Sequence, residues 1–186
     1  MRTPGWVAAL TAVCMVAGAA ARADEFKLSS PDVTEGGTIK PEQVFKGFGC
    51  TGMNVSPALS WTGAPASAKS FALTVYDPDA PTGSGFWHWV MFNIPASTHD
   101  LPKDAGDSAK GLVPAGAIAV RNDYGVAGYG GPCPPPGDKP HRYIFTVFAV
   151  DQGKLPIDAS VSPAVVGFNL HFHTIAKATL TGLYGH

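Results

Sequence analysis

The segment 129–148, YGGPCPPPGDKPHRYIFTVF, limits the possible folds more than any other part of the chain. Gly130 and Gly131 allow the backbone to approach a ligand closely or to adopt a positive φ angle. Four prolines fix φ and carry no N–H donor: Pro132, Pro134, Pro135 and Pro136. His141 and Tyr143 stand two residues apart at the start of the hydrophobic strand that follows, so their side chains are expected on one face. The pattern predicts a stiff loop that leads into a strand and forms a pocket wall.

Composition favours a single domain made mostly of β structure. The chain has 186 residues, of which 45% are hydrophobic and 15% charged, and it is therefore long enough to bury a substantial core. The 22 glycines and 17 prolines indicate many turns and short strands rather than long helices.

Alternating apolar residues locate the expected strands. The strands are predicted at residues 70–76, 86–94, 143–150 and 177–184. The apolar residues beyond Pro163 predict a helix, and the polar, small-residue stretch 96–116 predicts a long surface connection.

The N-terminus has the pattern of a signal peptide. Arg2 is followed by an apolar run at residues 6–20 and by Ala21-Arg22-Ala23, an A-x-A cleavage pattern. The alternative is a retained membrane anchor, but the run is shorter than the ~20 residues that a membrane span needs. Residues 1–23 are therefore predicted to be removed, leaving a domain at residues 24–186 that is not an integral membrane protein and lies in the periplasm or is secreted.

Charge and cysteine content narrow the classes of partner. The chain has 13 basic and 14 acidic residues, and removal of Arg2 and Arg22 leaves 11 and 14, a net charge of −3. No basic patch remains, which disfavours nucleic acid as a partner. Cleavage leaves Cys50 and Cys133 in a compartment that permits disulfides, so we expect them to pair. Two buried thiols are the alternative; a metal pair is less favoured because there is no CxxC motif.

Several polar residues stand at the ends of the predicted strands. Asp77 and Asp79, in the sequence DPDAP, are by themselves typical turn formers. His88, taken alone, is most simply a core histidine, and His141 stands at a junction between loop and strand. Because these residues lie beside rigid Pro and Gly loops, where binding residues tend to gather, they are candidates for a ligand site.

Three motifs in this order, DPDAP, WHWVMFNIP and GPCPPPGDKPHRYIF, resemble the phosphatidylethanolamine-binding protein family, also called Raf kinase inhibitor-like proteins, in its exported bacterial branch. The resemblance extends over most of residues 24–186. It implies a mainly β fold, an antiparallel β-sandwich with a few short helices and a small anion pocket at one end.

The resemblance also implies the ligand-binding residues. They are Asp77, Asp79, His88, Gly131, Pro134, His141 and Tyr143. Phe86 departs from the family pattern, since members often have tryptophan there; it keeps an aromatic wall but lacks the indole N–H. The sequence ends at His186, without the C-terminal helix that helps to close the pocket in eukaryotic members, so the lipid and kinase preferences of those members are not transferred.

Three functional classes remain open. The favoured one is a binding module for a phosphate-like or other anionic ligand, a small molecule or a phosphorylated head group, held by imidazole N–H and tyrosine O–H donors. The second is an inhibitor or interaction protein with a protein partner, and the third is a hydrolase that uses the Asp and His residues. The third is weakest because no GxSxG or HExxH motif is present. No catalytic residue, cofactor or metal site is predicted, and a homodimer is compatible with the sequence.

Further expectations concern the geometry and charge of the site. Asp77, Asp79, His88, His141 and Tyr143 are expected to converge on one pocket, with the aspartates orienting and charging the histidines. Both histidines are expected to gain charge between pH 8 and pH 6, which would tighten the binding of anions. The short DPDAP turn suggests a cis peptide between Ala80 and Pro81.

Overall fold

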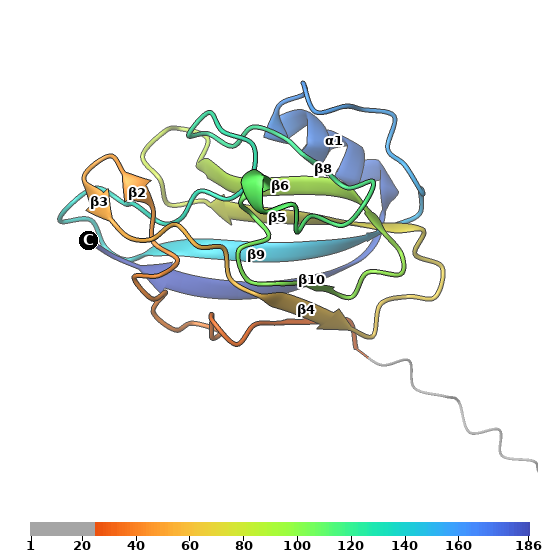
Figure 1. Ribbon diagram of the computed structural model, residues 1–186, viewed down its shortest axis with the longest axis horizontal. Helices are drawn as coiled ribbons and strands as arrows, with labels where there is room; N and C mark the ends of the chain where they lie inside the picture. The colour runs from red at the N-terminus through yellow and green to blue at the C-terminus, as the bar shows by residue number, and fades with distance from the viewer. Residues whose placement is uncertain (1–24) are drawn as a thin grey trace, which may run out of the picture.

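The computed structural model describes residues 25–186; the predicted signal peptide at residues 1–23 and its cleavage site lie outside the described residues. Two antiparallel sheets, one larger and one smaller, pack face to face (Figure 1), and a separate two-stranded hairpin is formed by β2 (Lys46–Gly47) and β3 (Cys50–Thr51). The larger sheet has the order β10-β9-β5-β6-β8, with β5 (Ser70–Asp77), β6 (Phe86–Pro95), β8 (Ile118–Ala119), β9 (His141–Val150) and β10 (Thr174–Tyr184). The smaller sheet has the order β1-β4-β7, with β1 (Lys27–Ser29), β4 (Leu59–Thr62) and β7 (Asp100–Leu101). The predicted antiparallel β-sandwich is confirmed.

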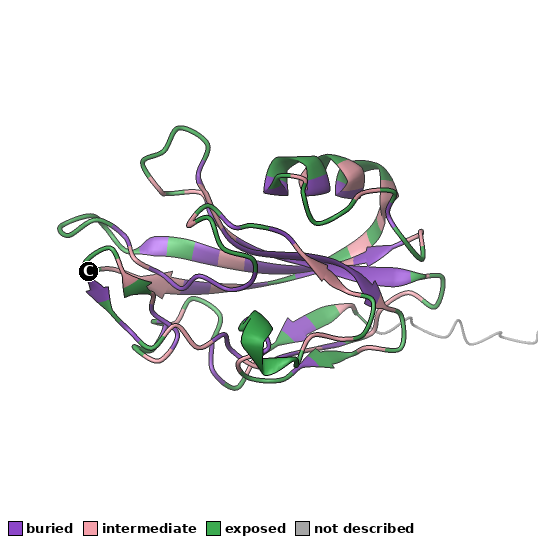
Figure 2. Ribbon diagram, turned by 45° about the horizontal axis from the view of Figure 1, so that its top comes forward, coloured by how far each residue is buried: buried purple, intermediate pink, exposed green. Residues whose placement is uncertain are grey.

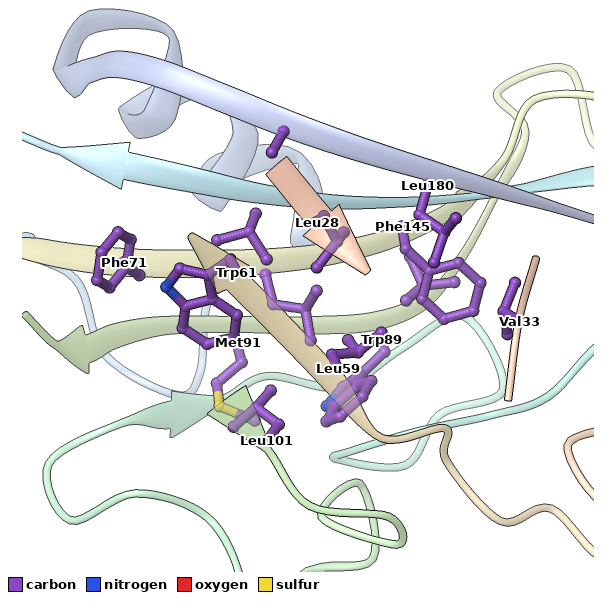
Figure 3. Packing of buried hydrophobic residues seen from close by; sticks show 14 of the residues in the cluster. Leu28, Val33, Leu59, Trp61, Phe71, Trp89, Met91, Leu101, Phe145 and Leu180 are labelled. Carbon is purple, nitrogen blue, oxygen red and sulfur yellow. The ribbon is translucent and has the colours of Figure 1, made fainter. Parts of the chain in front are cut away.

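Side-chain alternation along β5 explains why this strand lies at the centre of the fold. Phe71, Leu73 and Val75 point into the core between the two sheets, where they join Trp61 of the smaller sheet (Figure 3). Ala72, between them, packs in a second core on the opposite face. Both faces of the central strands are therefore covered, and Figure 2 shows the larger sheet as a buried layer between α1 and the smaller sheet.

Helix α1 (Pro163–His173) covers the outer face of the larger sheet. It begins at Ser162, whose hydroxyl accepts the N–H of Val165, and Pro163 occupies the first turn, where a missing N–H is tolerated. Val166 and Leu170 belong to the core on that face of the sheet. The helix predicted after Pro163 is therefore confirmed. No helix within residues 25–186 is long and apolar enough to cross a bilayer.

The register of the larger sheet brings three strand ends together. Asp77 at the end of β5 pairs with Phe86 at the start of β6, and Tyr76 pairs with Ile144 near the start of β9. The last residues of β5 therefore lie between the first residues of β6 and β9. This end of the sheet is where the polar residues predicted for the site are brought close to one another.

The stretch 96–116 differs from the predicted surface connection. It contains β7 and a 3-10 turn, Ser108–Lys110, and it buries Leu101 and Ala105 in the core between the sheets. A two-residue strand is too short to show an alternating pattern, so β7 was not predicted.

Candidate functional site

A cavity of about 330 Å³ opens at the end of the larger sheet where β5, β6 and β9 meet. Of the residues predicted for the site, five line it: Asp77, His88, Pro134, His141 and Tyr143. The rest of its wall is mainly aromatic and proline side chains, among them Phe86, the predicted aromatic wall. A volume near the lower end of the ~300–1,000 Å³ range of ligand sites suits a small molecule.

Asp77 is a buried carboxylate that is 2% exposed and whose hydrogen-bonding capacity is used by the protein itself. Its Oδ2 lies 2.8 Å from Nδ1 of His141. Its Oδ1 accepts the backbone N–H groups of Asp79, at 2.8 Å, and of Ala80, at 3.1 Å. Asp77 therefore orients His141 and turns the chain at the end of β5.

This turn also explains why the predicted cis peptide is wrong. Residues 25–186 contain no cis peptide bond, so Ala80–Pro81 is trans. The two N–H bonds to Asp77 reverse the chain direction, and Gly83 and Gly85, both with positive φ, complete the loop before β6. Only glycine adopts such angles readily, so the glycines allow a turn that the prediction had assigned to proline.

His141 lies between two carboxylates. Its Nδ1 contacts Asp77, and its Nε2 lies 3.5 Å from Oδ2 of Asp138, a half-exposed side chain in the loop that leads into β9. The ring is therefore held on one side by a buried acid, with a second acid at the opposite nitrogen. His141 is buried, and its edge forms part of the cavity wall.

His88 differs from His141 because its partner is a backbone carbonyl. Its Nδ1 lies 2.7 Å from the oxygen of Gly130, and a carbonyl only accepts hydrogen bonds, so Nδ1 is the donor. Its Nε2 is buried and has no partner within residues 25–186. Burial lowers the pKa of His88 to about 4, against the opposing effects of the Gly130 carbonyl and of Asp77. His88 is therefore neutral at pH 6 to 8, and the expectation that it gains charge there is wrong.

Tyr143 supplies a hydroxyl group. The side chain is 1% exposed, and its oxygen has no hydrogen-bond partner in the part of the chain that the structure describes. Burial raises the pKa of Tyr143, so the phenol keeps its proton and remains able to donate. The Tyr143 and His88 rings lie edge to face, with centroids 5.0 Å apart, so the two side chains are neighbours in the cavity wall.

Asp79 does not converge on this cavity, and that part of the prediction is wrong. Its two oxygens pair with the guanidinium of Arg142, Oδ2 with Nε at 2.8 Å and Oδ1 with Nη2 at 2.7 Å. Oδ2 also accepts the Arg142 backbone N–H at 2.9 Å. The Arg142 hydrogen bonds lower the pKa of Asp79 to about 2. The turn after Asp77 directs the second carboxylate to the outer side of β9.

Gly131, which was predicted as a ligand-binding residue, does not line the cavity and instead packs against neighbouring backbone. Its N–H donates to Oδ1 of Asn54 at 2.8 Å, and its carbonyl accepts the Tyr124 hydroxyl at 3.0 Å. A Cβ atom at this position would lie 2.0 Å from the carbonyl oxygen of Gln43. The N–H of Gly130 donates to the carbonyl of His88. The N–H groups of these two glycines are therefore used by the fold.

A disulfide joins strand β3 (Cys50–Thr51) to the loop that carries Cys133 at the opening of the cavity. The sulfurs of Cys50 and Cys133 are 2.06 Å apart and the Cα atoms 5.9 Å apart, which confirms the predicted pairing. Phe48, two residues before Cys50, lines the opening and is 82% exposed. Tyr124 lines it from another loop and stacks on Phe45, with centroids 3.8 Å apart.

Phe48 and Tyr124 were not predicted as site residues. Both stand in glycine-containing loops, GFGC and NDYG, which the sequence marks only as turns. The only features that set these loops apart are Cys50 near Phe48 and the pair Asn122-Asp123 before Tyr124. Neither feature shows that the aromatic side chain points toward a cavity. His171 and His173 stand on α1, and neither lines the cavity. Within residues 25–186, no group of three or more His, Cys, Asp or Glu side chains is arranged to hold a metal ion.

Comparison with known proteins agrees with the motifs. The family model described as phosphatidylethanolamine-binding protein matches residues 29–185. The UPF0098 protein YbcL of Escherichia coli is 51% identical over 164 residues, covering 88% of this chain and 90% of YbcL. Its crystal structure, described as that of a new member of the mammalian PEBP family, has a TM-score of 0.85 and covers 88% of this chain and 99% of that chain.

Two further relatives are a second UPF0098 protein and a protein named as a lipoprotein. The UPF0098 protein YbhB of E. coli is 48% identical over 158 residues, covering 85% of this chain and 99% of YbhB. LppC of Mycobacterium tuberculosis, which is named as a lipoprotein, is 37% identical over 165 residues and covers 89% of this chain and 72% of LppC.

Proposed function

Because the chain belongs to the phosphatidylethanolamine-binding protein family, we propose that it binds a small phosphate-like anion in the cavity at the end of the larger sheet. The observation that carries this proposal is the pair of buried, unpartnered polar groups on the cavity wall, Nε2 of His88 and the hydroxyl of Tyr143. An unpaired buried polar group costs about 1–3 kcal/mol. A ligand that bonds to both groups recovers this free energy.

The two parts of the wall suit different parts of a ligand. Tyr143 and the imidazole of His141 offer polar contacts at the buried end, while Phe48, Phe86 and Tyr124 offer aromatic surface toward the opening. An anionic group would therefore lie inside, with an organic substituent against the aromatic residues. This arrangement supports a phosphorylated or otherwise anionic small molecule, or the head group of a larger one.

The cavity offers little for covalent catalysis. Of the described residues, those that line it include no serine, the hydroxyl of Thr82 donates to the carbonyl of Gly85, and the one cysteine, Cys133, is held in the disulfide. The carboxylate of Asp77 already accepts three hydrogen bonds from the protein. These features favour a binding protein over a hydrolase.

We infer that the mature protein is exported to the periplasm or beyond. The N-terminal pattern of residues 1–23 is that of a signal peptide, and the Cys50–Cys133 disulfide suits an oxidising compartment. The name of the relative LppC, a lipoprotein, also favours export.

Calorimetric titration of residues 24–186 with methyl phosphate at pH 6 tests the binding proposal. We expect binding by the wild type and an affinity reduced about tenfold in Tyr143→Phe, since a hydrogen bond to a charged group contributes about 1.5–3 kcal/mol. The control is Tyr184→Phe, because Tyr184 lies at the end of β10 and does not line the cavity. No binding by the wild type, or equal affinities of the wild type and Tyr143→Phe, would overturn the proposal.

A further inference from the structure

The protonation of His88 limits which anions the cavity can accept. Nδ1 donates to the Gly130 carbonyl at 2.7 Å, so in the neutral ring Nε2 carries a lone pair and can only accept a hydrogen bond. Nε2 is buried and has no partner among the described residues, and the side chain to which it belongs lines the cavity. The ring thus presents an acceptor, and not the donor that an imidazolium would offer.

The groups that face His88 leave it without a carboxylate partner. On β5, Asp77 is bound to His141 and to its own turn. In the loop after β8, Asp123 accepts the backbone N–H of Trp87 at 2.7 Å, and Tyr124 packs edge to face on the imidazole. On β9, Tyr143 is a neutral phenol. Burial also lowers the pKa of His88, in agreement with these contacts.

An anion without a proton would place a lone pair of its oxygen against the lone pair of Nε2. Sulfate and phosphate diesters have no acidic O–H at neutral pH, so their oxygens can accept from Tyr143 but cannot donate to His88. A phosphate monoester in its monoanionic form has both kinds of oxygen, a P–OH that donates and P–O⁻ groups that accept. Only this form matches both unpartnered groups of the wall.

Building on the proposed function, we propose that the cavity selects oxyanions that carry an acidic O–H, such as the monoanion of a phosphate monoester, whose O–H donates to Nε2 of His88 while Tyr143 donates to a second oxygen. His88 is in this view a specificity-determining residue. The second pKa of a phosphate monoester is about 6. The monoanion, which is the form proposed to bind, therefore makes up about half of the free ligand at pH 6 and about one hundredth at pH 8.

Calorimetry with methyl phosphate, dimethyl phosphate and sulfate tests this selection. We expect the apparent affinity for methyl phosphate to fall about 50-fold from pH 6 to pH 8. Dimethyl phosphate and sulfate should bind at least tenfold more weakly than methyl phosphate at pH 6. Titrations in buffers of different ionisation enthalpy should show that methyl phosphate takes up close to one proton at pH 7.5, and sulfate none. Because a change of charge on the protein would act on sulfate as well, the difference between the two ligands reports the proton on the ligand.

The variant His88→Gln replaces the acceptor with an amide that can also donate. It should bind sulfate and methyl phosphate with affinities within threefold of each other, whereas His171→Gln, at an exposed position of α1 that does not line the cavity, should behave as the wild type. Should His88→Gln fail to fold, the ¹⁵N shifts of the wild-type His88 ring give a direct measurement. We expect Nε2 to carry no proton, both in the free protein and in the complex with methyl phosphate.

The outcomes separate this inference from the proposed function. Sulfate binding as tightly as methyl phosphate with the same proton uptake, or a doubly protonated His88 ring in the complex, would overturn the selection while leaving anion binding intact. An absence of binding by all three anions would overturn both.

Discussion

The cavity has a floor and a rim that are built differently. The floor lies on strands of the larger sheet and consists of Asp77, His88, His141 and Tyr143. The rim lies on loops and consists of Phe48, Tyr124 and Cys133. The floor residues are buried and held by the pairing of β5, β6 and β9. The rim has an exposed phenylalanine, and a disulfide ties the hairpin of β2 and β3 to the loop of Cys133.

The two regions should therefore respond to different perturbations. A change in the floor leaves buried polar groups unpaired, so we expect it to act on the stability of the whole domain and to depend on pH. A change in the rim frees loops, and we expect it to depend on redox conditions and to weaken binding while the sheet keeps its register.

The largest effect is expected for Asp77→Ala in the floor. The substitution leaves His141 Nδ1 and two backbone N–H groups without their acceptor, and breaking a buried pair of this kind costs about 4 kcal/mol. Urea denaturation followed by circular dichroism measures the loss. Asp100→Ala, at an exposed position of β7, is the matched control and should change stability by no more than about 0.5 kcal/mol. Similar losses in the two variants would contradict the role given to Asp77.

Opening the disulfide tests the rim. The bridge spans a sequence separation of 83 residues, and its loss, by reduction or in the double variant Cys50→Ala, Cys133→Ala, is expected to cost about 3 kcal/mol. Denaturation of residues 24–186 with and without reductant measures this difference. The affinity for methyl phosphate should also fall severalfold, because Phe48 and Cys133 lose their mutual constraint. Unchanged affinity in the folded, reduced protein would show that the rim does not contribute to binding.

The lowered pKa of His88 in the floor predicts how the free energy of unfolding of the domain depends on pH. Its pKa is lowered to about 4 in the folded protein from 6.5, so the unfolded state binds the proton more readily, and stability rises with pH in this window. The contribution is fully present above about pH 6.5 and is lost as pH falls toward 4; about 2 kcal/mol should disappear between pH 7 and pH 5. Denaturation of His88→Gln should show a slope shallower by about one proton over this range. Equal slopes for wild type and variant would show that His88 is charged in the folded state.

Asp79 gives the smallest effect, because it lies outside the floor. Its pKa is lowered to about 2 by Arg142, so its contribution is present above pH 4 and is lost as pH falls from 4 to 2. The side chain is partly exposed, and solvent screening reduces the contribution of the pair to about 1 kcal/mol. Asp79→Asn should therefore lower stability by about this amount at pH 6 and leave the affinity for methyl phosphate unchanged. A large loss of affinity in Asp79→Asn would show that Asp79 contributes to ligand binding after all.

Much of the fold was predictable because it depends on local patterns. Alternation located the four long strands to within three residues at either end, and Ser162 with Pro163 begins a helix where the sequence indicated one. Residues 96–116 were the exception, because their buried positions are single residues within a polar stretch. Such positions become buried only when the smaller sheet closes over the larger one.

The sequence by itself determined the strands, the stiff loops and the family motifs, and it indicated Cys50 and Cys133 as candidates for a disulfide. It also placed Asp77, His88, His141 and Tyr143 at strand ends, where the register could bring them together. Only the tertiary structure decided that Asp79 turns outward to Arg142, that Gly131 packs against Gln43 and that His88 meets a carbonyl rather than a carboxylate. The reason is physical: side-chain alternation and turn formation are local, whereas hydrogen-bond partners and the degree of burial, which sets the charge of His88, depend on contacts between residues far apart in the chain.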